Sequence, residues 1–268
     1  MKNITLSIFA LVIMLSSCQK VIDIDLNSAT PQYVIEAALV EGTQDFRVRV
    51  TKTSNYFSTD NVTSVNNATI TLKKDNGTPT TLTNESNGYY KTTNYTATNK
   101  VNYQLTVAVD GKTFDASSFL PKPVTLDSIS IEKSGGRPFG GNKADSSYQL
   151  YCNFQDPAGE ANYYQIKTTI NGVPNDKGGS ILVIEDRLTN GNKIRIPIFT
   201  TDFKLNDVVE IELLSIDKKV YDYFNTLSTL VSNGNNSAAP ANPLTNWSGG
   251  ALGYFGAFSS SKKTVLVR

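Results

Sequence analysis

The chain has 268 residues and carries 25 lysines and arginines against 24 aspartates and glutamates. This balanced charge argues against nucleic acid as a partner, because nucleic acid requires a cationic face. The sequence has no histidine, which excludes Ser-His-Asp and Cys-His catalysis and zinc sites with imidazole ligands. Carboxylate pairs and Ser-Lys dyads are still allowed in principle, but the sequence places none at catalytic separation. We therefore expect a protein that is not an enzyme and that has no metal or cofactor site.

The N-terminus has the pattern of an exported, lipid-anchored protein. Lys2 gives a basic start, residues 6–15 are apolar, and two serines precede Cys18. Such a stretch is typical of a secretory signal and is too short to span a membrane. The ending Leu-Ser-Ser-Cys resembles the lipobox of bacterial lipoproteins, and the alternative is an ordinary signal with an incidental cysteine. We predict that residues 1–17 are a signal peptide, that Cys18 carries acyl chains that form a stable anchor, and that residues 18–30 are a tether.

Residues 31–118 show a β-strand pattern. Short runs rich in Val, Ile, Thr, Tyr and Phe are separated by Asn, Gly and Asp, without helical periodicity. The candidate strands cover residues 33–40, 46–53, 68–74, 80–84, 88–93, 103–109 and 112–117. Asp110-Gly111 predicts a two-residue hairpin, because a type I′ turn needs positive φ. Short strands at this spacing predict an immunoglobulin-like sandwich, with Tyr103 as its corner tyrosine.

Two prolines mark residues 119–127 as a linker. Pro121 and Pro123 lack a backbone N–H and fix φ, which favours an extended, semi-rigid connector. Beyond the linker, residues 128–268 predict a second β domain. Its candidate strands cover residues 128–132, 148–154, 163–170, 180–186, 193–199, 208–215, 249–259 and 264–268.

This second domain should carry one helix near residues 217–233. Asp217 can cap its start. Apolar residues recur three and four apart on one face, namely Val220, Phe224, Leu227 and Val231. The predicted fold class is therefore mainly β, with an N-terminal immunoglobulin-like sandwich followed by a second β domain that carries one helix.

Four stretches resemble a known family. They are Cys18-Gln-Lys-Val-Ile-Asp-Ile-Asp25, Leu126-Asp-Ser-Ile-Ser130, Asp156-Pro-Ala-Gly-Glu-Ala-Asn-Tyr-Tyr164 and the most specific one, residues 242–258. Together they resemble domain-of-unknown-function family 4249, a family of Bacteroidota lipoproteins. The resemblance implies an outer-membrane lipoprotein, often encoded beside a TonB-dependent transporter, and it implies no catalytic residues.

The resemblance leads to two hypotheses of function. The first is an accessory or ligand-capturing subunit of a TonB-dependent transporter barrel, held at the outer membrane by its lipid anchor. The second is a stand-alone surface binding protein or adhesin for glycan or peptide. Whether the protein faces the cell surface or the periplasm is left open, because Asp23 and Asp25 are spaced and set back from Cys18, whereas surface lipoproteins of this phylum cluster acidic residues there.

An aromatic segment near the C-terminus is the candidate partner or ligand surface. Its residues are Trp247, Tyr254, Phe255 and Phe258. Aromatic side chains with few charges are typical of interfaces, although a core or domain-junction role is the alternative. Glycines in the same segment, such as Gly249 and Gly253, lack the strand-helix setting and the lysine of a phosphate loop, and bulges or close packing are favoured.

Three further positions have specific interpretations. Asp127-Ser128-Ile129 resembles an O-glycosylation acceptor of the same phylum, and a polar lead-in to a strand is the alternative for Ser128. Cys152 alternates with apolar residues, which favours a buried structural thiol over a nucleophile. Asp156 and Glu160 could offer oxygen ligands to calcium, but they lack the alternating acidic pattern of a calcium loop, so a tight turn is favoured.

Overall fold

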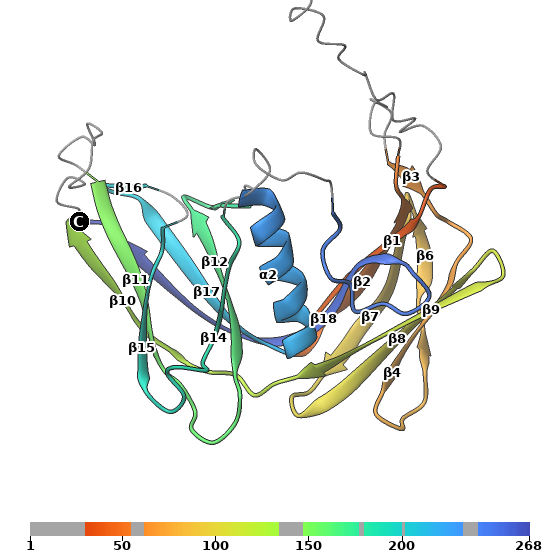
Figure 1. Ribbon diagram of the computed structural model, residues 1–268, viewed down its shortest axis with the longest axis horizontal. Helices are drawn as coiled ribbons and strands as arrows, with labels where there is room; N and C mark the ends of the chain where they lie inside the picture. Colours follow the sequence, from red (N-terminus) through yellow and green to blue (C-terminus); the bar gives the residue numbers. More distant parts are fainter. Residues whose placement is uncertain (1–29, 55–61, 134–146, 177–179, 200–201, 233–240) are drawn as a thin grey trace, which may run out of the picture.

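The computed structural model describes residues 30–54, 62–133, 147–176, 180–199, 202–232 and 241–268. Within these residues the chain is mainly β with one helix, as predicted (Figure 1). Cys18, the predicted signal peptide and the tether up to residue 29 lie outside the described residues. The helix of the described part lacks the length and apolar character needed to cross a bilayer.

The described strands form three sheets. The largest has ten strands, in the order β13 (Val173–Pro174), β12 (Tyr163–Ile170), β17 (Val208–Ile216), β18 (Leu252–Leu266), β1 (Tyr33–Val40), β2 (Gly42–Lys52), β7 (Tyr89–Ala97) and β6 (Thr83–Ser86), with β14 (Leu182–Glu185) beside β12 and β3 (Thr63–Ser64) beside β2. The N-side sheet comprises β5 (Thr80–Thr81), β4 (Thr69–Lys74), β8 (Val101–Val109) and β9 (Lys112–Leu120). The C-side sheet comprises β10 (Leu126–Lys133), β11 (Ser147–Gln155), β15 (Lys193–Pro197) and β16 (Phe203–Lys204), the last beside β11.

Two hydrophobic cores lie side by side along the large sheet. The first is enclosed by β1, β2, β7 and the N-side sheet, and the second by β12, β17 and the C-side sheet. Phe255 and Ala257 pack in the first core and Val265 packs against the second. Alternate residues of a strand point to the same face, so both small sheets cover one face of the large sheet. Phe258 points the other way and packs in a third cluster under the helix.

Strand β18 joins the two cores. Its first half pairs in parallel with β1, from Val34↔Leu252 to Val40↔Phe258, and its second half pairs antiparallel with β17. The prediction of two strands, 249–259 and 264–268, was therefore wrong. The polar run between them suggested a break, but its side chains have partners on β17. Ser260 Oγ donates to Glu212 Oε1 at 2.6 Å, and Lys262 Nζ lies 3.4 Å from Glu210 Oε1.

The first sandwich takes residues from both ends of the chain. Its predicted range, 31–118, supplies most of the first core, but Trp247, Ala251 and the first half of β18 complete it. The predicted linker, residues 119–127, crosses from one core to the other and is fastened on the way. Val124 N donates to Ser215 Oγ at 3.2 Å, and Leu126 N donates to Ser261 Oγ at 2.9 Å.

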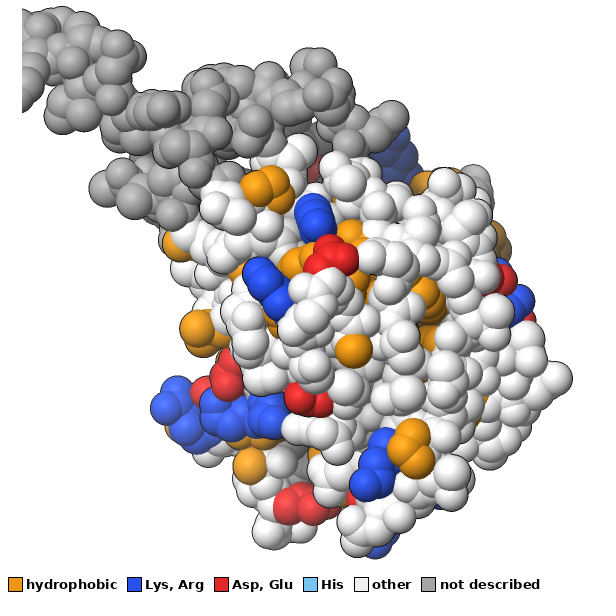
Figure 2. All heavy atoms as spheres, turned by 90° about the vertical axis from the view of Figure 1, so that its right-hand side faces the viewer, with side chains coloured by type: hydrophobic (Ala, Val, Ile, Leu, Met, Phe, Trp, Pro, Cys, Tyr) orange, Lys and Arg blue, Asp and Glu red, His pale blue; other side chains and the backbone are white. Residues whose placement is uncertain are grey.

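Two local predictions in the first sandwich are confirmed. Asp110 and Gly111 have φ values of 49° and 72° and form the turn between β8 and β9. Tyr103 is a corner tyrosine, because its hydroxyl accepts from Thr98 N at 2.8 Å and donates to Thr98 O at 3.1 Å. Figure 2 shows a face of the molecule on which apolar and charged side chains are scattered rather than gathered into one patch.

The helix, α2 (Lys218–Ser232), lies where it was predicted, and Figure 1 shows it between the two sandwiches. Val220 and Tyr223 are its buried residues, whereas Val231 of the predicted apolar stripe is exposed. Tyr223 takes the buried position because its ring packs 4.9 Å from that of Tyr254 on β18.

Candidate functional site

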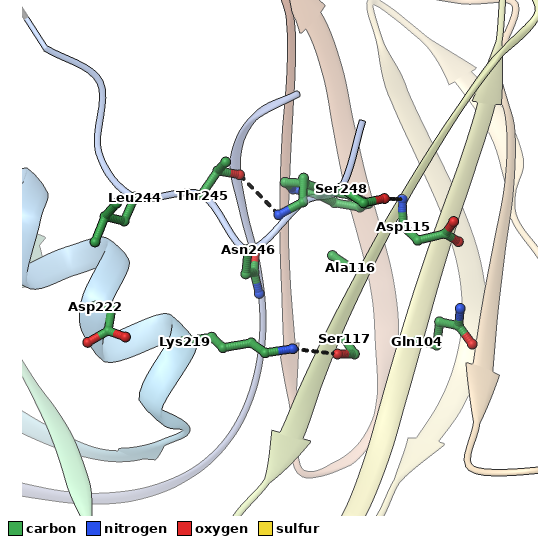
Figure 3. Close-up of a pocket in the computed structure, with 11 residues that line it drawn as sticks. Gln104, Asp115, Ala116, Ser117, Lys219, Asp222, Leu244, Thr245, Asn246 and Ser248 are labelled. Carbon is green, nitrogen blue, oxygen red and sulfur yellow. Dashed lines mark hydrogen bonds between the residues drawn. The ribbon is translucent and has the colours of Figure 1, made fainter. Parts of the chain in front are cut away.

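A polar groove separates α2 from β9 (Figure 3). Its volume is about 560 Å³, and segment 244–248 forms one of its walls. The residues that line it are Gln104, Asp115, Ala116, Ser117, Lys219, Asp222, Leu244, Thr245, Asn246, Trp247 and Ser248. Groups from the N-side sheet, the helix and the segment before β18 thus converge on one space.

Side-chain hydrogen bonds hold segment 244–248 against the free edge of β18. Asn246 bonds to both backbone groups of Phe255, and Thr245 Oγ1 donates to Gly253 O at 2.9 Å. The segment is also tied to the helix, because Leu244 N donates to Thr226 Oγ1 at 3.0 Å. Hydrogen bonds therefore hold this wall of the groove to both of its neighbours.

The other end of the segment is fastened to β9 and β1. Ser248 Oγ accepts from Asp115 N at 3.0 Å, and Ser248 N donates to Asp115 O at 2.8 Å. Trp247 forms an antiparallel bridge with Ala116, and its indole Nε1 donates to Ile35 O at 3.0 Å. The only tryptophan of the chain is thus an anchor between two sheets.

Two hydrogen bonds fasten the start of α2 to β9. Asp217 caps the helix through Val220 N, which donates to Oδ1 at 2.9 Å. Its Oδ2 accepts from Ser118 Oγ at 2.7 Å and from Phe119 N at 2.8 Å. Burial raises the pKa of the Asp217 carboxyl. One carboxylate therefore links the helix to β9.

Charge in the groove is sparse and mixed. Lys219 reaches across from α2 and donates to Ser117 Oγ at 2.8 Å (Figure 3). Asp222 is paired with Lys218 at 2.7 Å on the helix surface. Asp115 adds a second carboxylate, and most other lining groups are neutral hydroxyls and amides, several of which are already bonded within the walls. The described residues contain no group of three metal-ligating side chains. Such a lining is suited to holding a polar ligand by hydrogen bonds.

The predicted aromatic surface was wrong for Phe255 and Phe258, which are 0% and 4% exposed and belong to the cores, as the alternative interpretation held. Trp247 is 5% exposed and packs in the first core, but it also lines the groove. Tyr254 is half-buried, and its ring lies 4.9 Å from Tyr223 and 4.8 Å from Phe224. The segment is aromatic because β18 needs apolar side chains on both faces, and sequence alone could not show that both faces are covered.

The glycines of the same segment have structural roles. Gly253 has a φ of 89°, and a Cβ there would lie 2.2 Å from Ile35 O, where β1 runs directly alongside. Gly249 has a φ of 72° and lies against Thr113 and Phe114. Both fit the predicted close packing.

The other predicted positions lie apart from the groove. Cys152 is buried in the second core, and burial raises the pKa of its thiol to about 12. Asp156 is buried and accepts from Tyr164 Oη at 2.5 Å and from Gly191 N at 2.8 Å, so it organises two loops, whereas Glu160 is exposed. Ser128 is exposed on β10, next to a register shift, and its glycosylation stays a prediction.

Sequence reasoning missed most residues that shape the groove. Ser117, Ser118 and Asn246 carry no local signal, because a serine on a strand and an asparagine before a tryptophan are common. Sequence reasoning found Trp247, as a candidate ligand-surface residue, and Asp217, through its capping pattern. The missed residues act across long separations, such as the 139 positions between Ser118 Oγ and Ala257 N, which are bonded at 2.9 Å.

Comparison with known proteins gives a family but no activity. The sequence model of a family described as a domain of unknown function (DUF4249) matches residues 19–264. One similar solved structure is the adhesin InvE of Yersinia pseudotuberculosis, at 14% identity and a TM-score of 0.23, covering 68% of this chain and 55% of that chain. This chain therefore spans about half the length of that chain, and so low a score carries no argument. None of the curated proteins matches.

Proposed function

Because the chain belongs to the DUF4249 family, we propose that it is an outer-membrane lipoprotein that captures a polar ligand as an accessory subunit of a TonB-dependent transporter. The lipobox-like sequence that ends at Cys18 supports the anchor, and the family resemblance supports the transporter. The observation that carries ligand capture is the polar groove between α2 and β9.

The groove has the properties of a binding site. Its volume of about 560 Å³ lies within the range of small-molecule sites. Its walls are tied together by Ser118, Asp217, Asn246 and Ser248, so little ordering is needed when a ligand binds. A lipid anchor raises the effective concentration of this groove beside a membrane partner, so a modest affinity is sufficient.

A stand-alone binder of glycan or peptide is the second candidate. It is supported by the groove itself, whose walls are β9, α2 and segment 244–248. A groove of this kind can hold a ligand without a transporter, and the lipid at Cys18 would then serve only for display.

Co-purification from outer membranes distinguishes the two. We expect the tagged lipoprotein, extracted in mild detergent, to bring a transporter barrel with it. A double variant of two exposed groove residues, Gln104→Ala and Lys219→Ala, should keep the barrel but reduce ligand uptake by the cells. The matched control is Lys193→Ala, an exposed lysine on β15, outside the groove. Recovery of the lipoprotein alone, with ligand binding by the isolated protein, would identify the stand-alone binder.

A further inference from the structure

A row of four side chains crosses the open face of the large sheet. Tyr254, Glu36, Arg49 and Tyr89 are successive partners on β18, β1, β2 and β7. Partners that lie directly opposite point to the same face, and their chain neighbours Ile35, Val48, Tyr90 and Phe255 are buried in the first core. The row therefore lies on the face that is turned away from the core, beside α2.

The two charged side chains at the centre of the row have no ionic or hydrogen-bonding partner among the described residues. Glu36 and Arg49 are cross-strand partners, yet among the described residues no ion pair within 4 Å and no side-chain hydrogen bond involves either one. The neighbouring charged residues, in contrast, are paired. Arg47 Nε lies 2.9 Å from Glu85 Oε2, and Lys91 Nζ lies 3.1 Å from Glu85 Oε1. A carboxylate and a guanidinium are thus available side by side.

Aromatic rings bound the row at both ends. Tyr89 is 39% exposed, and the guanidinium of Arg49 lies 5.6 Å from the centre of its ring. Tyr254 at the other end is supported by Tyr223 and Phe224 of α2. Between the two tyrosines lies a shallow hollow of about 330 Å³, which is lined in part by the small side chain of Ala38. Four strands about 4.8 Å apart place the two tyrosines about 14 Å from each other.

We propose that this face binds an oligosaccharide. The tyrosines offer flat apolar faces to sugar rings. A sugar hydroxyl both donates and accepts, so neighbouring hydroxyls can pair with a carboxylate that only accepts and a guanidinium that only donates. The length of the row suits a chain of sugars better than a single ring.

A protein partner fits the same face less well. Strands β1, β2 and β7 are internal to the sheet, and the edge of β18 beside Tyr254 is already bonded to Thr245 and Asn246, so the row offers no free backbone edge for an added strand. Its centre is charged, whereas the centres of protein interfaces are depleted in Glu and Asp. The inference goes beyond the proposed function, because this face shares no residue with the groove.

Affinity electrophoresis tests the inference directly. The mature lipoprotein in detergent would be run in native gels containing amylose, xylan, β-mannan, laminarin, polygalacturonate or alginate. At least one polysaccharide should retard it, and titration with an oligosaccharide of that polymer gives the affinity. Tyr89→Ala and Glu36→Gln should each weaken binding at least tenfold. Both residues are accessible, so the melting temperature should change little.

A similar pair elsewhere provides the control. Arg195 lies over the ring of Tyr151, 3.4 Å from its centre, on the C-side sheet, and Arg195→Gln should leave binding unchanged. Retardation by none of the six polysaccharides would overturn the inference. Binding that survives Tyr89→Ala and Glu36→Gln, or that falls equally in Arg195→Gln, would overturn it as well. Co-purification of a barrel is independent of these results, so failure here leaves the proposed function standing.

Discussion

Asn246 bonds to Phe255 as a neighbouring strand would. Its Nδ2 donates to Phe255 O at 2.7 Å, and its Oδ1 accepts from Phe255 N at 3.0 Å. The first half of β18 pairs with β1 on one side, and on its other side this carboxamide replaces a strand. These two hydrogen bonds matter because Phe255 is fully buried, and an unpaired backbone N–H or C=O there would lower the free energy of unfolding.

Replacing Asn246 should therefore destabilise the fold. Asn246→Ala leaves two backbone groups of β18 without partners, and we expect a loss of about 2–4 kcal/mol in the free energy of unfolding. Asn246→Asp should cost at least as much, because a carboxylate cannot donate to Phe255 O. Urea unfolding measures both. Asn242→Ala, at an exposed asparagine just before segment 244–248, is the control and should change stability by less than about 0.5 kcal/mol.

Trp247 provides a second stability test. Trp247→Phe keeps most of the apolar contact but loses the bond to Ile35 O, and it should cost about 1–3 kcal/mol. Trp247→Ala also leaves a cavity between β9 and β1 and should cost about 3–5 kcal/mol. Thermal unfolding ranks the variants. If Trp247→Ala were as stable as the wild type, the residue could not be an anchor of the first core.

Local patterns were sufficient for most of the strands. The predicted bounds 33–40 and 163–170 coincide with β1 and β12, because alternation and turn residues act over a few positions. Strand β18 was not found as one element, since its serines and lysines fit a strand only beside Glu210 and Glu212 of β17. The continuity of β18 therefore depends on partners that lie far away in the sequence.

The site was harder to predict than the fold, for the same reason. The aromatic segment was interpreted as a surface because its residue types suit both an interface and a core. Whether Phe258 is covered depends on α2, whose packing on that face is set by Val220 and its neighbours. The row on the open face was equally hidden, because Glu36, Arg49 and Tyr89 become neighbours only through strand register.

Cys152 should be chemically inert in the folded protein. Its thiol is buried in the second core, and burial raises its pKa to about 12, so little thiolate forms at neutral pH. We expect iodoacetamide to alkylate Cys152 only when the protein is unfolded in urea, at a rate set by unfolding. Ser128→Cys, at an exposed position, should be alkylated at once without urea. Rapid alkylation of native Cys152 would contradict its placement in the core.

Lipidation at Cys18 is predicted from the lipobox-like sequence. Metabolic labelling with a palmitate analogue should mark the protein, and Cys18→Ala should abolish the label. Cys152→Ala is the matched control and should keep it, because this buried thiol has no route to an acyl donor. A label that persists in Cys18→Ala would show that the anchor lies elsewhere.

Asp217 should make stability depend on pH. Burial raises the pKa of its carboxyl in the folded protein above the ordinary value, so the folded state binds this proton more tightly than the unfolded chain. By linkage, the free energy of unfolding should fall as pH rises from the unfolded pKa, about 4, through the raised folded pKa. Asp217→Asn stays neutral and should lose this fall. The difference in the free energy of unfolding between the wild type and the variant should therefore shrink as the pH rises above about 4.

Ser118 provides the matched test of the cause. Its hydroxyl donates to Asp217 Oδ2 at 2.7 Å and favours the ionised form, against the effect of burial. Ser118→Ala should therefore raise the pKa further and make the fall in stability with pH steeper. Urea unfolding across this range, with carbon NMR of the Asp217 carboxyl, measures both effects. The free energy of unfolding of the wild type could instead rise with pH relative to that of Asp217→Asn. In that case the three hydrogen bonds to the carboxylate would outweigh its burial, and the link between α2 and β9 would be strongest when Asp217 is charged.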